Sequence, residues 1–284
     1  MISTAAVITH RRPEVTADAL AALLTAAARA GVKLCCGVDE LGKHSGLRHA
    51  LSAPIGAGLA LDVDICFALG GDGTILTALR AYAGTGVPVF GVNYGEMGFL
   101  ATVDREHADE GWRRALTGDF EVLSLPGIEL SDSHGHRWLA FNDVSINRLQ
   151  GNRVADLGYS VGSDEVGRVR CDGLVVATPA GSTGYNLANG GPVMAWGVEG
   201  FVVSFIAPHS LTARPLVVAP ADIVSVDNRS REEPAEVTVD GRPMCLLQAG
   251  EGMHARFTAN QGTLAQIPGT SFYSRLRQKF GRLA

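Results

Sequence analysis

The stretch CFALGGDGTILTALR, Cys66 to Arg80, joins an apolar run to a helical pattern through a turn that holds three glycines and one carboxylate. A strand that enters such a turn and continues as a helix directs backbone N–H groups, and the positive end of the helix, at the space above the strand. Phosphate is the commonest ligand of this arrangement, because glycines let an anion approach the backbone closely. We therefore predict a phosphate loop made of Gly70, Gly71, Gly73 and Thr74.

Asp72 is the unexpected residue of this loop, since a carboxylate repels phosphate. Two roles resolve the conflict: it accepts the proton of an attacking hydroxyl, or it holds a metal ion that neutralises the phosphates. The plainer alternative is a tight turn with a helix-capping aspartate. The loop lacks the lysine of a Walker A sequence, and no GxxxxGK[ST] stretch occurs in the chain.

Around this loop, residues 1–121 alternate strand-like and helix-like patterns, which predicts a parallel sheet covered by helices. Apolar runs predict strands, and the spacing of apolar residues predicts helices between them. The expected strands are residues 5–9, 32–38, 64–70 and 87–93, and the expected helices are 16–31 and 74–83. Cys35 and Cys36 lie in an apolar run and are expected to be core residues.

The pattern changes at residues 122–264, where short runs of period two are separated by Gly, Pro, Asn and Asp. This spacing predicts an antiparallel all-β domain of roughly nine strands. The final segment, residues 265–284, contains Phe272, Leu276 and Phe280 at helical spacing among basic residues. We expect a short amphipathic helix that docks on another surface, rather than a basic helix that binds membrane.

Composition sets outer bounds on function. At about 150 residues per domain, a chain of 284 residues predicts two domains, and its 46% hydrophobic content fits a globular protein. The formal charge of −5 gives no reason to expect a nucleic-acid partner. No apolar run reaches about 18 residues, so no membrane partner is expected. The N-terminal charge order is wrong for a secretory signal, and five cysteines without CxxC fit neither a disulfide scaffold nor a zinc knuckle. We expect a cytoplasmic location.

Two further glycine clusters are candidate binding elements. GVNYGEMGFLA, residues 91–101, follows the expected strand 87–93 and should open at the same sheet edge as the first loop, with Phe99 flooring an apolar slot. RCDGLVVATPAGSTGYNLANGGP, residues 170–192, has more small hydroxyl and glycine positions than a plain hairpin needs. Upstream, Asn142 and Asp143 are adjacent, so both reach one ligand only at a strand end or bulge.

Several other polar residues are expected to have structural roles. His209 has no second His or Cys at ligand spacing, so a hydrogen-bonding role is favoured over a metal site. His134 and His136 fit a polar hairpin tip better than a metal pair. Asp240-Gly241 predicts a hairpin turn, with a ligand role as the alternative.

In order, these clusters resemble an NAD kinase of the bacterial type, from about Asp64 to the C-terminus. The motifs are GGDGT, GxNxGxxGFL, the Asn-acid pair, DGxxxxTPxGSTxY, APHSLTARPLV (207–217) and LLQAGE (246–251). The resemblance implies a Rossmann-like, phosphofructokinase-like α/β domain followed by an all-β, sandwich-like domain, with the last segment returning to the first domain. It implies homo-oligomers, dimers or tetramers, in which a neighbouring subunit completes the site.

The resemblance also implies the reaction, transfer of the γ-phosphoryl of ATP to the 2′-hydroxyl of the adenosine ribose of NAD, with Mg²⁺ accompanying ATP. Asp72 would be the proton acceptor, and no metal would be fixed by the protein alone. The implied substrate-binding residues are Gly73, Phe99, Asn142, Asp143, Arg153, Arg170, Asp172, Ala180, Thr183, Gly184, Tyr185, Asn186, Leu187, Ala188, Ala207 and Gln248. The choice between ATP and polyphosphate, and between NAD and NADH, stays open.

The chain departs from the family pattern in three places. Asp143 stands where Glu is usual and is one methylene shorter, and Gly184 replaces a common Ala. Glu96 is expected to point away from phosphate, since its charge would repel it. Two other functions were considered: a diacylglycerol-type lipid kinase, which shares GGDGT, and a dinucleotide sensor without transfer activity.

Overall fold

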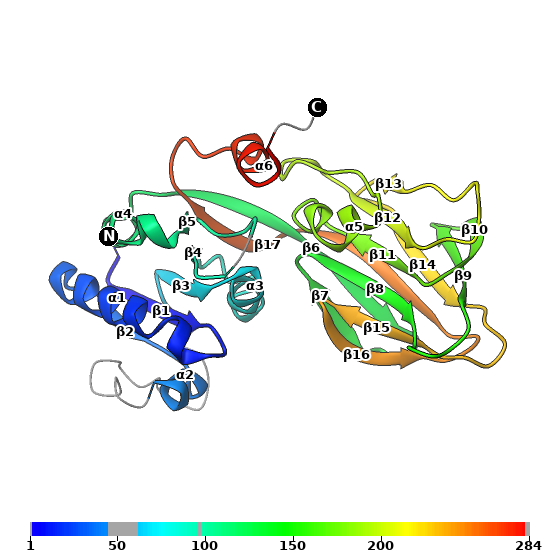
Figure 1. The fold of residues 1–284 in the computed structure, drawn as a ribbon, viewed down its shortest axis with the longest axis horizontal. Coiled ribbons are helices and arrows are strands. Elements are labelled where there is room, and N and C mark those ends of the chain that lie inside the picture. Colours follow the sequence, from blue (N-terminus) through cyan, green and yellow to red (C-terminus); the bar gives the residue numbers. More distant parts are fainter. Residues whose placement is uncertain (1, 45–61, 96–97, 282–284) are drawn as a thin grey trace. The chain divides into compact units, whose positions relative to one another are not determined.

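The computed structural model describes residues 2–44, 62–95 and 98–281, which form two compact units (Figure 1). The first comprises residues 1–124 and 261–284, and the second residues 125–260. The predicted division into residues 1–121, 122–264 and 265–284 stays a prediction. Each unit is described by itself.

The first unit is built on a parallel sheet. Its strands lie in the order β4, β3, β1, β2, and the short β5 and the end of β17 both pair with β4 in parallel. The expected adjacency of the strands before the first two glycine clusters is confirmed, since Gly70 of β3 pairs with Asn93 of β4. The strands are β1 (Thr4–Thr9), β2 (Lys33–Cys35), β3 (Ile65–Gly70), β4 (Val89–Asn93) and β5 (Val103–Asp104).

Helices bury the apolar residues of this sheet. Trp112 of α4 packs with Phe67 and Phe90 of the sheet, with ring centroids 5.6 and 6.4 Å away, and residues of α1 share that core. Ile75 of α3 packs on Gly91, where a side chain would collide with it. The helices are α1 (Ala17–Ala30), α2 (Val38–Lys43), α3 (Asp72–Ala81), α4 (Ala108–Thr117) and α6 (Phe272–Phe280).

The second unit is an all-β sandwich. One antiparallel sheet has the order β13, β12, β11, β8, β15, β16, and antiparallel pairing also joins β10, β9, β14 and β17. Both sets contribute to one core, for example Val144 and Val176 from the first and Leu157 and Val226 from the second. The elements are β6 (Glu121–Asp132), β7 (Arg137–Ala140), β8 (Asp143–Arg148), β9 (Ala155–Val161), β10 (Asp164–Cys171), β11 (Gly173–Ala177), α5 (Tyr185–Ala188), β12 (Phe201–Ile206), β13 (Leu216–Val218), β14 (Ile223–Asn228), β15 (Ala235–Val239), β16 (Arg242–Leu247) and β17 (Gly252–Gln266).

The α/β-plus-β fold class is confirmed, but two details were wrong. The β region has twelve strands, β6 to β17, instead of roughly nine. The period-two runs 138–148 and 165–178 each contain two strands with a bend between them, and β6 and the hairpin partner β16 were missed. Helix α3 begins at Asp72, not Thr74, so the predicted loop includes the first helical turn.

Two smaller expectations, the helix near the C-terminus and the buried cysteines, are confirmed. Residues 272–280 form a helix whose Phe272 and Leu276 are buried, and Ser271 and Ser274 form a capping box at its start. Cys35 and Cys36 are buried and unpaired. Among the described residues, no helix is both long enough and apolar enough to cross a membrane.

Candidate active site

In the first unit, Asp72 opens helix α3 at the end of the buried strand β3. Gly71 is the extended residue before the helix, with φ −86° and ψ −172°. The first N–H groups of a helix have no intrahelical acceptor and carry the positive end of its dipole. The helix start therefore favours an anion, and Asp72 lies in that first turn.

The Asp72 carboxylate is held by the backbone of the second glycine cluster. Its Oδ2 accepts a hydrogen bond from the Phe99 N–H at 2.9 Å, and its Oδ1 accepts one from the Leu100 N–H at 3.1 Å. Gly98 has to be a glycine, because a Cβ there would collide with the Asp72 carboxylate. Each oxygen keeps a second lone pair that can accept a proton or hydrogen bond from a ligand.

The two glycine clusters also touch through their backbones. The Tyr94 N–H donates to the Gly70 carbonyl at 3.1 Å, and Gly95 packs on Gly71. Asn93 fixes this contact: its Oδ1 accepts from the Gly95 N–H at 3.1 Å. The expectation that both loops open at the same sheet edge is therefore confirmed.

Three predicted site residues of this region differ in solvent exposure. Thr74 is buried, and its side chain fills the space that a Cβ on Gly70 would occupy. Phe99 is buried too, and its ring lies 5.3 Å from that of Phe280. Gly73 is exposed, with open space where a side chain would be. Glu96 lies outside the described residues.

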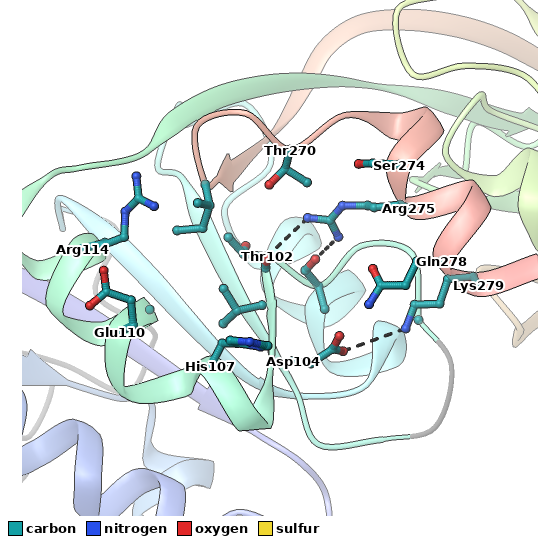
Figure 2. A pocket seen from close by; sticks show the side chains of 15 residues that line it. Thr102, Asp104, His107, Glu110, Arg114, Thr270, Ser274, Arg275, Gln278 and Lys279 are labelled. Carbon is teal, nitrogen blue, oxygen red and sulfur yellow. Dashed lines mark hydrogen bonds and ion pairs between the residues drawn. The ribbon is translucent and has the colours of Figure 1, made fainter. Parts of the chain in front are cut away.

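Opposing effects act on the charge of Asp72. Burial raises the pKa of this carboxyl, while the hydrogen bonds from Phe99 and Leu100 and the charges of Lys279 and Arg275 lower it. Both cations belong to α6 and line a pocket of about 370 Å³ with Asp104 and Gly98 (Figure 2). The net direction is upward, so Asp72 titrates closer to neutrality than an exposed aspartate.

In the second unit, Asn142 and Asp143 lie where β8 begins. A strand end is one of the two places, with a bulge, at which adjacent side chains can reach one ligand. The Asp240 carboxylate accepts hydrogen bonds from the N–H groups of Asn142 at 2.7 Å and Phe141 at 3.1 Å. Asp240 and Gly241 have φ of 46° and 72°, which confirms the predicted hairpin turn. The turn thus fixes the backbone of the Asn-acid pair.

The side chains of this pair are prepared for a polar ligand. Asn142 Oδ1 is buried without a hydrogen-bond partner among the described residues. Burial, and then the charge of Asp240, raise the pKa of Asp143 to about 7. An unpaired buried acceptor and a carboxyl that titrates at neutral pH are both typical of a binding site.

The stretch after β11 folds back beside this pair. Gly184 lies near the Asp143 carboxylate, and the charge of Asp143 helps burial to raise the pKa of Tyr185. Asn186 is buried, and its side chain donates to the carbonyls of Ser182 and Pro192, so it shapes the loop. Of the other predicted residues here, Ala180 is buried, Thr183 and Leu187 are half-buried, and Ala188 is exposed.

The remaining predicted residues lie elsewhere in this unit. Arg153 and Arg170 line an arginine-rich pocket of about 460 Å³. Asp172 forms an ion pair with Arg148, at 2.5 Å. Ala207 follows β12 with φ 43°, and Gln248 is exposed in the turn before β17.

His134 and His136 form the polar hairpin tip that was expected. The turn lies between β6 and β7, and Asp132 accepts hydrogen bonds from the backbone N–H groups of both histidines. No cluster of three or more His, Cys, Asp or Glu side chains fit to hold a metal occurs among the described residues.

Sequence reasoning missed one residue beside Asp72. Arg275 lies on the apolar face of α6, three residues after Phe272 and one before Leu276, and it is buried. A cation in an apolar stripe was the available signal, because a buried arginine needs acceptors.

Comparison with known proteins supplies two family matches. Residues 53–120 match the ATP-NAD kinase N-terminal domain, and residues 141–264 match the ATP-NAD kinase C-terminal domain. A protein from Gemmatimonas aurantiaca named NAD kinase is 37% identical over 226 residues, which is 77% of this chain and 78% of that protein. One from Geobacter sulfurreducens, also named NAD kinase, is 32% identical over 246 residues, or 84% and 85% of the two chains.

Solved structures give the same fold. The crystal structure of an NAD kinase from Archaeoglobus fulgidus in complex with ATP has a TM-score of 0.74 and 26% identity, and the match covers 98% of this chain and 97% of that one. Yeast NADH kinase complexed with NADH has a TM-score of 0.84 at 19% identity, covering 100% and 90% of the two chains.

Proposed function

Because this chain belongs to the NAD kinase family, we propose that it transfers the γ-phosphoryl group of ATP to the 2′-hydroxyl of the adenosine ribose of NAD, giving NADP. The observation that carries the proposal is the placement of Asp72. This carboxylate lies in the first turn of a helix that follows a buried parallel strand, beside an exposed glycine backbone at Gly73.

Asp72 is the proton acceptor in this proposal. The ribose oxygen bonds to the γ-phosphorus, the bond from that phosphorus to the bridging oxygen breaks, and ADP leaves. The proton of the hydroxyl goes to an Asp72 oxygen, whose second lone pair is not used by Phe99 or Leu100. A carboxylate with a raised pKa is a better base near neutral pH than an exposed one.

In the second unit, the Asn-acid pair is proposed to bind the adenosine part of NAD. The unpartnered Oδ1 of Asn142 fits a ligand N–H or O–H, and the Asp143 carboxylate fits two hydroxyl donors. The Asp240 carboxylate accepts hydrogen bonds from the backbone N–H groups of Asn142 and Asp143, which fixes the backbone of the pair. We retain the other predicted substrate contacts as proposals: Gly73, Phe99, Arg153, Arg170, Asp172, Ala180, Thr183, Gly184, Tyr185, Asn186, Leu187, Ala188, Ala207 and Gln248, with Gly70, Gly71 and Thr74 as the phosphate loop.

Mg²⁺ is proposed to accompany the donor phosphates, which supply oxygen ligands themselves. We propose that this cation arrives with ATP and is not held by the chain alone. Its chemistry is to offset phosphate charge beside Asp72. A cytoplasmic location and a homodimer or homotetramer belong to the same proposal.

Neither alternative function is favoured. The ATP-NAD kinase matches cover residues of both units. A sensor without transfer activity would not need the Asp72 carboxylate and its two amide donors.

The test is NADP formation from NAD, ATP and Mg²⁺ by the purified chain, measured with an NADP-specific dehydrogenase. Parallel reactions replace ATP with polyphosphate, NAD with NADH, or NAD with diacylglycerol. We expect NADP from NAD and ATP. Binding of NAD without any NADP from either donor would overturn the proposal in favour of a sensor, and phosphorylated diacylglycerol would overturn it in favour of a lipid kinase.

A further inference from the structure

Helix α6 is joined to the Asp72 site through one buried arginine. Arg275 is 8% exposed, and its guanidinium donates hydrogen bonds to the carbonyls of Phe99 at 3.1 Å and Thr102 at 3.3 Å, and to that of Ala101. It also donates to the Gln266 side chain at 2.5 Å. Figure 2 shows the Arg275 side chain extending from α6 toward the backbone at Thr102.

The bonded segment is the one that holds Asp72. Phe99 donates its N–H to the Asp72 carboxylate and accepts from Arg275 with its carbonyl. Leu100, the other amide donor to Asp72, lies between two residues whose carbonyls Arg275 binds. The peptide group between Phe99 and Leu100 therefore donates its N–H to Asp72 and accepts from Arg275 with its carbonyl, and the planar, forked guanidinium also holds the carbonyls that follow it.

Charge acts in the same place. The cations that face Asp72 are Arg275 and Lys279, both on α6, and each lowers the pKa that burial raises. Asp104 of β5 faces both, with its Oδ1 3.9 Å from the Lys279 ammonium. Lys279 has no hydrogen bond to residues 98–102 in the described structure, so it contributes charge alone, whereas Arg275 contributes charge and bonds.

We propose that Arg275 is a positioning residue for the phosphoryl transfer, acting on Asp72 through the backbone of residues 99–102. It holds the Phe99 and Leu100 amides where they orient the carboxylate, and it favours the ionised form that accepts the proton. This inference rests on the proposed function. It gives the C-terminal helix, far from Asp72 in sequence, a part in catalysis.

The test compares three variants with wild type: Arg275→Gln, Arg275→Lys and Lys279→Gln. Arg277→Gln is the matched control, because Arg277 is exposed on the same helix. We expect Arg275→Gln to lower kcat roughly 10- to 100-fold, with the KM for NAD within about threefold. In the pH profile of kcat, the fall on the acid side (the acid limb) moves to higher pH, because the loss of a cation beside Asp72 raises the pKa of that carboxyl.

The other variants separate bonds from charge. Lys279→Gln shifts the acid limb to higher pH as well but keeps most of kcat. Arg275→Lys loses kcat, since an ammonium lacks the forked donor geometry of a guanidinium, but it shows less of the pH shift because the positive charge remains. If Arg275→Gln has the same kcat and the same acid limb as the control Arg277→Gln, the inference is overturned, whatever the thermal stability of the variant. If Arg275→Gln does not fold, wild-type kcat in Arg275→Lys overturns it instead. A wild-type enzyme that makes no NADP contradicts the proposed function rather than this inference.

Discussion

Asp72 and Asp143 are both carboxylates at the end of a strand whose pKa is raised by burial. The charges around them have opposite effects on that pKa. Asp72 receives two backbone hydrogen bonds and faces two cations, all of which oppose the effect of burial on its pKa. Asp143 faces a second carboxylate, Asp240, which adds to the effect of burial. The difference fits the two proposed roles, in which Asp72 is the base and Asp143 is an acceptor for hydrogen bonds from the ligand.

The largest expected effect is on Asp72. Asp72→Asn removes the proton acceptor and leaves the shape, so kcat should fall roughly 10²- to 10⁴-fold while the affinity for NAD stays near wild type. NADP formation and calorimetric NAD binding measure the two quantities. Asp18→Asn is the matched control, because Asp18 is an exposed aspartate in the first turn of α1. Near-normal turnover in Asp72→Asn would show that Asp72 is not the proton acceptor, and the proposed difference in role between Asp72 and Asp143 would be lost.

Asp143 should show the opposite division between binding and turnover. Asp143→Asn loses a charged acceptor, which is worth about 1.5 kcal/mol or more, so the Kd for NAD should rise roughly 10-fold or more with kcat little changed. In wild type, NAD affinity should increase from pH 6 to pH 8, because Asp143 ionises near pH 7. Calorimetry at pH 6, 7 and 8 should find no such increase in the variant. An equal increase in both proteins would exclude Asp143 as its source.

The same substitution should stabilise the fold at alkaline pH. The folded pKa of about 7 exceeds the ordinary 3.8, so protonation stabilises the folded chain fully below about pH 4, and this contribution is lost as the pH rises toward 7. At ~1.4 kcal/mol per pH unit, the loss is on the order of 4 kcal/mol. The Tm of Asp143→Asn relative to wild type should therefore increase between pH 5 and pH 8. A difference that is constant with pH would contradict the raised pKa.

The smallest expected effect concerns the residue behind Asp143. Asp240→Asn keeps a residue type that tolerates φ 46° but removes the like charge beside Asp143. NAD affinity should fall only about threefold, from the weaker acceptor for the Asn142 and Phe141 amides. The pH at which affinity rises should move lower, because Asp143 ionises more easily. Asp164→Asn, in an exposed hairpin, serves as the control. If Asp240→Asn leaves the pH midpoint of the rise in NAD affinity unchanged, Asp240 does not influence the ionisation of Asp143.

Local pattern and long-range packing explain what the sequence could predict. The strand–glycine–helix order predicted the sheet edge at Gly70, and the adjacency of Asn142 and Asp143 limited a shared ligand to a strand end or a bulge, because both follow from backbone periodicity over a few residues. The Asp240 turn was predictable from Asp-Gly, but its bonds to residues 98 positions away were not. Arg275 binds Phe99 across 176 positions, a contact set by packing of α6 on the first unit. Asp240 and Arg275 both bind backbone atoms far away in the sequence, and residue types do not reveal such partners; the position of Arg275 in an apolar stripe indicated only that it needs acceptors.

The pH dependence of kcat in Asp72→Asn, compared with wild type at saturating NAD and ATP, tests the role of Asp72 as proton acceptor most directly. If Asp72 takes the ribose proton, wild-type kcat falls on the acid side as the carboxylate becomes protonated, and the small residual kcat of the variant shows no such fall. An acid limb that persists in Asp72→Asn with the wild-type midpoint would assign the proton transfer to another group.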